Sequence, residues 1–217
     1  ERLKMSVLYG ADAVYLGSTM FGMRAAAAKF DFDTLKKGVE YAHNKNVKVY
    51  LTLNTLVSDG ELETAYEAVK YACVINADAL ILQDLGLAAV VRRVSQSMPM
   101  HASTQMSVHN TRGAEEAARM GCSRVVPARE LSEGDIRTLV DNSPVEVEVF
   151  LHGALCVCHS GQCLFSSLVG GRSGNRGECA QPCRLPYQTK GANKYPLSLK
   201  DLSLAAHVRE LCDMGVA

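Results

Sequence analysis

The 217 residues are enough for one large α/β domain or two small ones, and the 47% of hydrophobic residues suffice for a full core, which excludes a disordered chain. Lysine plus arginine equals aspartate plus glutamate at 23 each, so net charge predicts neither a nucleic acid nor a membrane as partner, and any nucleic-acid site has to be a local patch. No apolar run approaches the ~18 residues of a membrane span, and cysteines within helix-like segments fit reduced thiols, so we expect a cytoplasmic protein.

Short apolar runs alternate with segments of helical periodicity along the chain. We predict one strand at the end of each of the segments 9–17 and 75–84. Further predicted strands cover 47–53, 98–103, 124–128 and 145–151, and a weaker candidate covers 196–199. The predicted helices are 32–44, 60–75, 85–97, 110–121 and 132–141. Gly10 and Asn76 tolerate the left-handed conformation, and we expect each to end the helix before a strand.

This alternation predicts parallel βαβ units whose strands are covered on both faces. We expect a (β/α)8 TIM-like barrel, truncated at both ends, that needs one strand before residue 1 and one after residue 217. An open doubly wound sheet is the alternative, disfavoured because no G-x-G-x-x-G follows the first strand. We divide the chain into barrel units at 1–151, a cysteine-rich loop inserted at 152–196, and a last strand–helix unit at 197–217 that leaves the barrel incomplete.

Polar residues recur where the apolar runs stop, and the active sites of barrels are built from the carboxyl ends of their strands. For any single position, capping of the strand end is the alternative interpretation. We predict a polar pocket for a small anion there. Its expected catalytic residues are His101, Gln105, His152 and Glu130, and its expected substrate-binding residues are Arg24, Gln83, Asp84 and Ser103.

Four cysteines, Cys156, Cys163, Cys179 and Cys183, lie in a Gly-rich and Arg-bearing segment that follows the strand-like run 145–151. Thiolates gathered in this way are typical of zinc or iron–sulfur sites. Structural zinc sites favour pairs with two to four residues between cysteines, whereas the first pair here has six and the second three. We therefore expect a [4Fe–4S] cluster, with zinc as the alternative, and assign no role to Cys158.

The segment EVFLHGALCVCHSGQCLFSS at 148–167 resembles the signature of peptidase family U32, the collagenase-like proteins. The blocks AVYLG, LTLN, LQDLG, HASTQM, ARELS and SLKDL extend the resemblance over nearly the whole chain. It implies that Cys156, Cys163, Cys179 and Cys183 ligate a [4Fe–4S] cluster. It also implies hydroxylation of RNA bases without O₂, at a tRNA wobble uridine first and an rRNA cytidine next, with prephenate as hydroxyl donor. Related subunits that work as pairs are a further implication.

The segment 170–200 carries six basic residues against one acid, Glu178. We interpret this excess as a footprint for RNA phosphates or for a small dicarboxylate, with Arg184 and Lys200 among the substrate-binding residues. A solvated loop, or cations that offset anionic thiolates, is the alternative. Two other functions stay open: a true peptidase, although no H-E-x-x-H or G-x-S-x-G motif is present, and a zinc-stapled scaffold that binds RNA or a partner.

Overall fold

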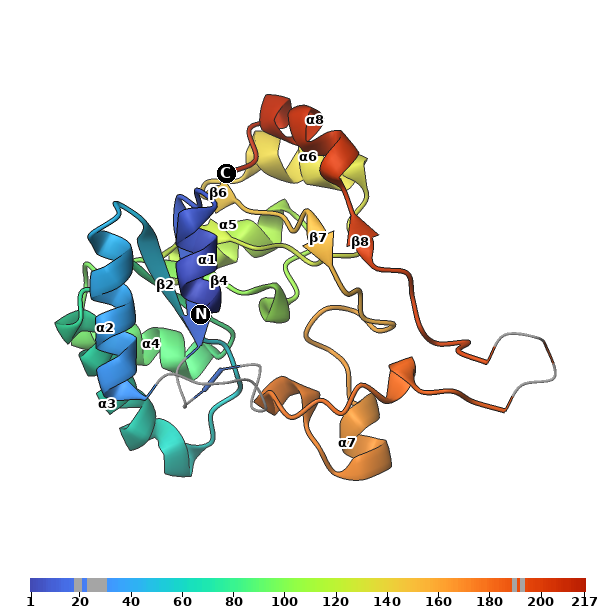
Figure 1. Ribbon diagram of the computed structural model, residues 1–217, viewed down its shortest axis with the longest axis horizontal. Coiled ribbons are helices and arrows are strands. Elements are labelled where there is room, and N and C mark those ends of the chain that lie inside the picture. The colour runs from blue at the N-terminus through green and yellow to red at the C-terminus, as the bar shows by residue number, and fades with distance from the viewer. Residues whose placement is uncertain (18–20, 23–30, 189–190, 192–193) are drawn as a thin grey trace.

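A computed structural model describes residues 1–17, 21–22, 31–188, 191 and 194–217 of the chain. Its centre is a parallel sheet of six strands in the order β1-β2-β3-β4-β5-β6 (Figure 1). The strands are β1 Ala13–Gly17, β2 Lys48–Leu53, β3 Ala79–Leu82, β4 Met100–Ala102, β5 Cys122–Val125 and β6 Glu146–Val147. The predicted α/β class and all six principal strands are confirmed.

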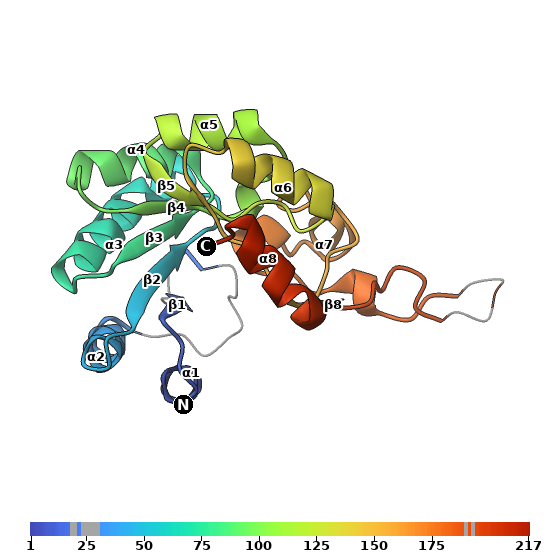
Figure 2. The ribbon, with the colours of Figure 1, turned by 90° about the horizontal axis from the view of Figure 1, so that it is seen from above.

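The strand order distinguishes a barrel from a doubly wound sheet. In a doubly wound sheet the order reverses at a switch point, whereas here every strand pairs with the one before it in the chain. Helix α1 Arg2–Leu8 precedes β1, and the helices α2 Phe32–His43, α3 Leu62–Val74, α4 Leu85–Val94, α5 Thr111–Arg119 and α6 Glu133–Asn142 connect successive strands. Figure 2 shows them on the outside of a curved sheet, as in a TIM-like barrel. Within the described residues, β1 and β6 do not pair with each other.

The two faces of the sheet differ in chemistry. On β2, Val49, Leu51 and Leu53 face the helices and are buried, whereas Lys48 on the other face is exposed. The strand register aligns one row on that inner face, from Gly17 through Thr52, Ile81, His101 and Arg124 to Glu146. The inner face therefore carries ionisable side chains at its centre.

The residues that end α1 and α3 explain how the chain passes from each of these helices to the next strand. Gly10 (φ 86°) follows the end of α1, and Asn76 (φ 57°) follows the end of α3. Both occupy the left-handed region that the sequence predicts for them, because glycine and asparagine enter it at low cost. Among the described residues, every helix is too short to cross a membrane.

The last third of the chain departs from the prediction. Residues 196–199 form a turn and irregular chain rather than a strand, since Pro196 has no N–H to donate to a ladder. The strand that returns is β8 Leu202–Ser203, which pairs antiparallel with β7 His152–Gly153 in a separate two-stranded sheet. This pair brackets the cysteine-rich segment, which carries the short helix α7 Phe165–Gly170.

The run 145–151 also differs from the expected single strand, because only Glu146 and Val147 pair with β5 before the chain turns away toward β7. After β8, helix α8 Val208–Met214 leads the chain back to the open edge of the sheet. There the Ala217 N–H donates to the Val147 carbonyl at 2.9 Å. The cysteine-rich segment thus lies between β6 and the last residues of the sequence, which return to the β6 edge of the sheet.

Candidate functional site

The cysteine-rich segment is fastened to the carboxyl end of the sheet through Glu130, which follows β5. The Glu130 carboxylate accepts the Ser160 backbone N–H and the Ser160 hydroxyl, both at 2.8 Å. The Ser160 hydroxyl oxygen in turn accepts the Arg129 backbone N–H at 3.3 Å. Partial burial raises the pKa of Glu130, but hydrogen bonds, chiefly those from the Ser160 N–H and hydroxyl, outweigh it and lower the pKa to about 2. Glu130 is therefore a fixed anion at neutral pH rather than a proton donor.

A second set of contacts seats the same segment on the loop after β4. The Ser107 hydroxyl donates to the Ser160 carbonyl, and the Gln162 side-chain amide donates to the Ser107 oxygen at 3.1 Å. Gly161 lies against this loop with φ 76°, and a Cβ on it would stand 2.0 Å from the Gln105 carbonyl oxygen. Only glycine fits this position, because a side chain would collide with backbone as well as adopt a disfavoured conformation. The backbone of Gln105 thus forms part of the seat.

Five thiols gather beside this seat. The pKa of Cys158 is raised by partial burial, then by a hydrogen bond with Cys163 and by the nearby charges of Cys163, Cys156 and Cys183. Burial likewise raises the pKa of Cys183. The charge of Arg184 lowers this pKa, and the charges of three neighbouring thiols raise it. All five are free, and Cys156, Cys158 and Cys179 are exposed. The four predicted ligands are therefore brought together, and Cys158 lies with them.

Arg129 connects the thiols to the barrel. Its guanidinium donates to the Cys156 sulfur at 3.1 Å and to the Ala154 carbonyl at 2.9 Å. A cation at this distance stabilises the thiolate form, which is the form that binds metals. Arg129 lies next to Glu130 in the chain, so the sequence after β5 supplies both an anion for the loop backbone and a cation for its sulfur.

The predicted basic footprint is largely engaged in holding the segment together. Arg176 forms a bidentate ion pair with Glu61, at 2.7 and 2.5 Å, and donates to the Leu56 carbonyl at 2.8 Å. The Arg184 guanidinium donates to the Ser198 hydroxyl at 2.8 Å and to the Leu155 carbonyl at 3.0 Å. For Lys200 no ion pair is recorded among the described residues. The arginines of the footprint hold the segment together through their hydrogen bonds, and among the described residues the exposed Lys194 and Lys200 remain for a phosphate.

His101 lies on the buried inner face rather than in an open pocket. It is 5% exposed, meets Tyr50 edge-on with ring centroids 4.7 Å apart, and its Nδ1 has no partner among the described residues. Burial, aided by the charges of Arg124 and Lys48 and opposed by Glu146, lowers the pKa of His101 to about 4. The ring is therefore neutral at pH 7.

The remaining predicted site residues that the structure describes occupy several different places in it. Gln83 and Ser103 are buried at strand ends, where Ser103 accepts the Asn54 amide at 3.3 Å. Asp84 caps α4 by accepting the Leu87 N–H at 2.9 Å, so the capping alternative holds for it. The exposed His152 sits in β7, and Arg24 lies outside the described residues. A cavity of about 230 Å³ lies instead between α6 and α8, with mostly apolar walls.

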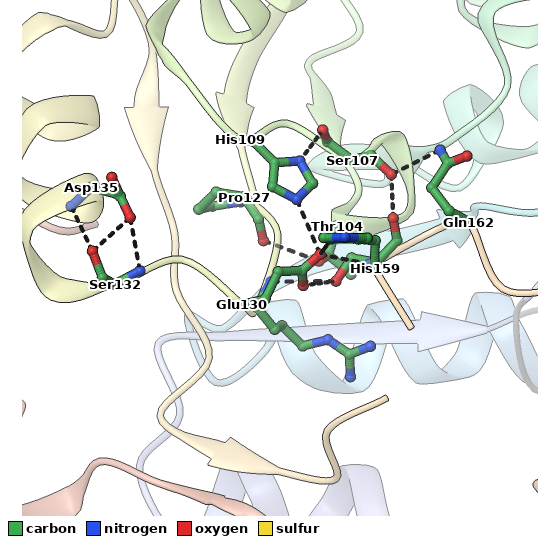
Figure 3. A network of polar contacts seen from close by, with 11 residues as sticks. Thr104, Ser107, His109, Pro127, Glu130, Ser132, Asp135, His159 and Gln162 are labelled. Carbon is green, nitrogen blue, oxygen red and sulfur yellow. Dashed lines mark hydrogen bonds and ion pairs between the residues drawn. The ribbon is translucent and has the colours of Figure 1, made fainter. Parts of the chain in front are cut away.

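Two histidines that the sequence analysis passed over belong to the site. His109, in the loop before α5, places Nε2 at 3.0 Å from Glu130 Oε1, and His159, in the cysteine-rich segment, places Nδ1 at 3.2 Å from the same atom. Figure 3 shows both rings directed at this carboxylate. Only His159 had a sequence signal, its place between Cys158 and Cys163.

Comparisons with known proteins agree with this architecture. The family model described as peptidase family U32 matches residues 1–217. A 23S rRNA 5-hydroxycytidine synthase of Escherichia coli is 38% identical over 97% of this chain and 33% of its own length. A tRNA hydroxylation protein of Bacillus subtilis is 34% identical over all of this chain and 54% of its own.

The chain thus spans between a third and about half of these relatives. A solved structure of a U32 peptidase shares the fold, with a TM-score of 0.58 and 14% identity over 67% of this chain and 62% of that one. The full-length family match and the shared fold lead to one conclusion: the chain belongs to peptidase family U32.

Proposed function

We propose that this chain forms the core of an enzyme that hydroxylates a base of RNA, with a [4Fe–4S] cluster held by Cys156, Cys163, Cys179 and Cys183. The observation that carries the proposal is the seating of these thiols at the carboxyl end of the barrel strands, where barrel enzymes place their chemistry. The names of the two RNA-modifying relatives support the substrate class. A tRNA uridine is the first candidate and an rRNA cytidine the second.

The donor set fits an iron–sulfur cluster better than a single zinc ion. Tetrahedral zinc with Zn–S bonds of about 2.3 Å holds its sulfurs roughly 3.8 Å apart. Among the described residues, the group with ligand atoms within 4.8 Å of one another includes none of the thiols. The wider spacing supports a larger centre. When bound, such a cluster would supply the redox chemistry that replacing C–H by C–OH on a base requires.

The chain's own residues define what surrounds that centre. Arg129 would donate a hydrogen bond to the Cys156 sulfur, and Glu130 with Ser160 would hold the loop at one position relative to the strand ends. Prephenate is our proposed hydroxyl donor, in keeping with the resemblance in the cysteine signature. Lys194 and Lys200 are the described lysines of the basic segment, and both are exposed toward an RNA or dicarboxylate ligand.

Nucleoside mass spectrometry tests the function in cells. A strain that lacks the gene is complemented with the full-length protein, its Cys163→Ser variant, or a Cys212→Ser control on α8 outside the loop. We expect a hydroxylated nucleoside to return with the wild type and the control, and to stay absent with Cys163→Ser. Iron and sulfide measured on anaerobically purified protein should follow the same pattern. Unchanged nucleosides in the deletion strain would refute the proposal.

The peptidase suggested by the family name makes a different prediction. A serine or cysteine peptidase requires a nucleophile activated by a base, yet among the described residues no histidine is hydrogen bonded to a serine hydroxyl or a cysteine thiol. If protein purified free of contaminating proteases hydrolyses gelatin, and Cys163→Ser leaves this activity intact, the peptidase is the better assignment. Stoichiometric zinc without iron would favour the scaffold.

A further inference from the structure

Three side chains from distant parts of the chain meet beside the thiols without including any of them. His109 follows β4, Glu130 follows β5, and His159 belongs to the cysteine-rich segment. Their ligand atoms all lie within 4.8 Å of one another (Figure 3). Two imidazoles and one carboxylate make up the protein ligands of many zinc sites and of ferrous sites with open positions.

The hydrogen bonds of His109 define which of its nitrogens is free. Its Nδ1 lies 2.7 Å from the Ser107 carbonyl oxygen, which can only accept, so Nδ1 carries the hydrogen. In a neutral ring Nε2 then presents a lone pair, and it faces the carboxylate oxygen Glu130 Oε1 at 3.0 Å. Two acceptors at this distance need a cation between them. Metal-bound histidines show the same arrangement, in which the second ring N–H donates to a backbone carbonyl.

The carboxylate is oriented from its other side. Ser160 donates its N–H to Glu130 Oε1 and its hydroxyl to Oε2, each at 2.8 Å. These bonds hold the carboxylate as outer partners hold a ligating carboxylate in metal sites. Metal–ligand bonds of roughly 2.0–2.1 Å at tetrahedral or octahedral angles place donor atoms about 2.9–3.4 Å apart. The spacings of 3.0 and 3.2 Å from Oε1 to the two histidine nitrogens fall in this range.

Exposure distinguishes the two imidazoles. The side chain of His159 is 75% exposed, whereas that of His109 is 33% exposed and that of Glu130 31%. The site is therefore firm on the barrel side and open to solvent on the loop side. An ion here would join the cysteine-rich segment to the strand ends and keep positions free for water or an oxygen ligand.

We propose that His109 Nε2, Glu130 Oε1 and His159 Nδ1 bind one divalent ion of the zinc or ferrous class, separate from whatever the cysteines hold. The nitrogen donors favour such ions over calcium or magnesium, which take oxygen ligands. The proposal does not rest on RNA hydroxylation. The competing explanation is an imidazolium of His109 paired with Glu130.

Metal counting tests the site on the full-length protein. Anaerobically purified wild type is equilibrated with buffered Zn²⁺ beside His159→Gln, His109→Gln and a His207→Gln control, whose histidine pairs with Glu210 on the protein surface. We expect wild type and control to hold about one zinc ion per chain more than the other two variants, with equal iron in all four. Equal zinc in all proteins, or an equal loss in His207→Gln, would overturn the proposal.

A spectroscopic measurement covers the case in which a variant disturbs the loop. Nitrogen NMR of the histidine rings in wild-type protein should show zinc binding at His109 Nε2 and His159 Nδ1, with the hydrogen of His109 Nδ1 retained. Substitution with Co²⁺ should give d–d absorption without thiolate charge transfer, and His159→Gln should abolish it. Two protonated nitrogens on His109 at saturating zinc would instead establish the imidazolium pair.

Discussion

Replacing Gly161 by alanine should detach the cysteine-rich segment while the barrel stays folded. The new Cβ would stand 2.0 Å from the Gln105 carbonyl oxygen, which belongs to backbone and cannot move aside. The left-handed conformation alone costs an L-residue about 1–2 kcal/mol. The hydrogen bonds of Ser107 with Ser160 and Gln162, at about 1 kcal/mol each, oppose withdrawal of the segment equally in the wild type and the variant. The strain of about 1–2 kcal/mol alone lowers the docked population roughly 5- to 30-fold, and the clash lowers it further.

Hydrogen exchange followed by mass spectrometry measures this docking peptide by peptide. The control is Gly170→Ala on α7, because a Cβ there meets nothing within 4 Å. In Gly161→Ala we expect the peptide around 156–163 to lose protection and the purified protein to lose its metal, with strands β2 to β4 unchanged. If Gly161→Ala keeps the protection and metal content of the control, the steric account of the seat is refuted.

Three further predictions concern groups whose environment is unusual. The pKa of His101 is lowered from 6.5 to about 4, so its contribution to stability is complete above pH 6.5 and is lost as pH falls through 4. Between these pH values the free energy of unfolding of the wild type should fall by at most about 3 kcal/mol more than that of His101→Phe. Denaturation curves that give the two proteins parallel pH profiles would contradict this prediction. Asp84→Ala should cost about 1 kcal/mol of stability, and more if the Val57 N–H finds no water, whereas Asp84→Asn should recover most of it. Arg176→Glu should speed proteolysis of the cysteine-rich segment, and the double variant with Glu61→Arg should slow it again; additive effects would show that the ion pair is not what ties the segment down.

The parts of the fold that could be predicted are those that depend on residues close together in the sequence. The order of strands and helices follows from hydrophobic periodicity, and Gly10 and Asn76 mark helix ends through their own backbone preferences. The strands β7 and β8 have two residues each, too few for any periodicity, so their pairing was not predictable. Pro196 lay inside the one predicted strand that proved wrong, and its missing N–H was a signal against that assignment.

The candidate site shows the same division between local and long-range information. The cysteines could be chosen from sequence because they cluster within a single segment. His109 could not, because its partners Glu130 and His159 lie 21 and 50 positions further along the chain, and only the fold brings them together. The segment 170–200 was interpreted as a phosphate footprint because charge alone is visible in a sequence, whereas Arg176 in it is paired with Glu61, 115 residues earlier.

The docking of the segment and the loading of its thiols should stabilise each other. Burial and neighbouring thiols raise the pKa of Cys183, so without a bound metal Cys183 favours its protonated form. A bound metal centre reverses this, because its ligand thiols must lose their protons. As a metal ligand Cys156 would be a thiolate, and its contact with the Arg129 guanidinium would be a charge-assisted hydrogen bond. The backbone N–H of Arg129 also donates to the Ser160 hydroxyl oxygen. The residue whose hydrogen bond to Cys156 is strengthened by metal binding is therefore also one that holds the cysteine-rich segment in place. Since coupling of this kind is reciprocal, metal binding must strengthen docking by the same factor by which docking strengthens metal binding.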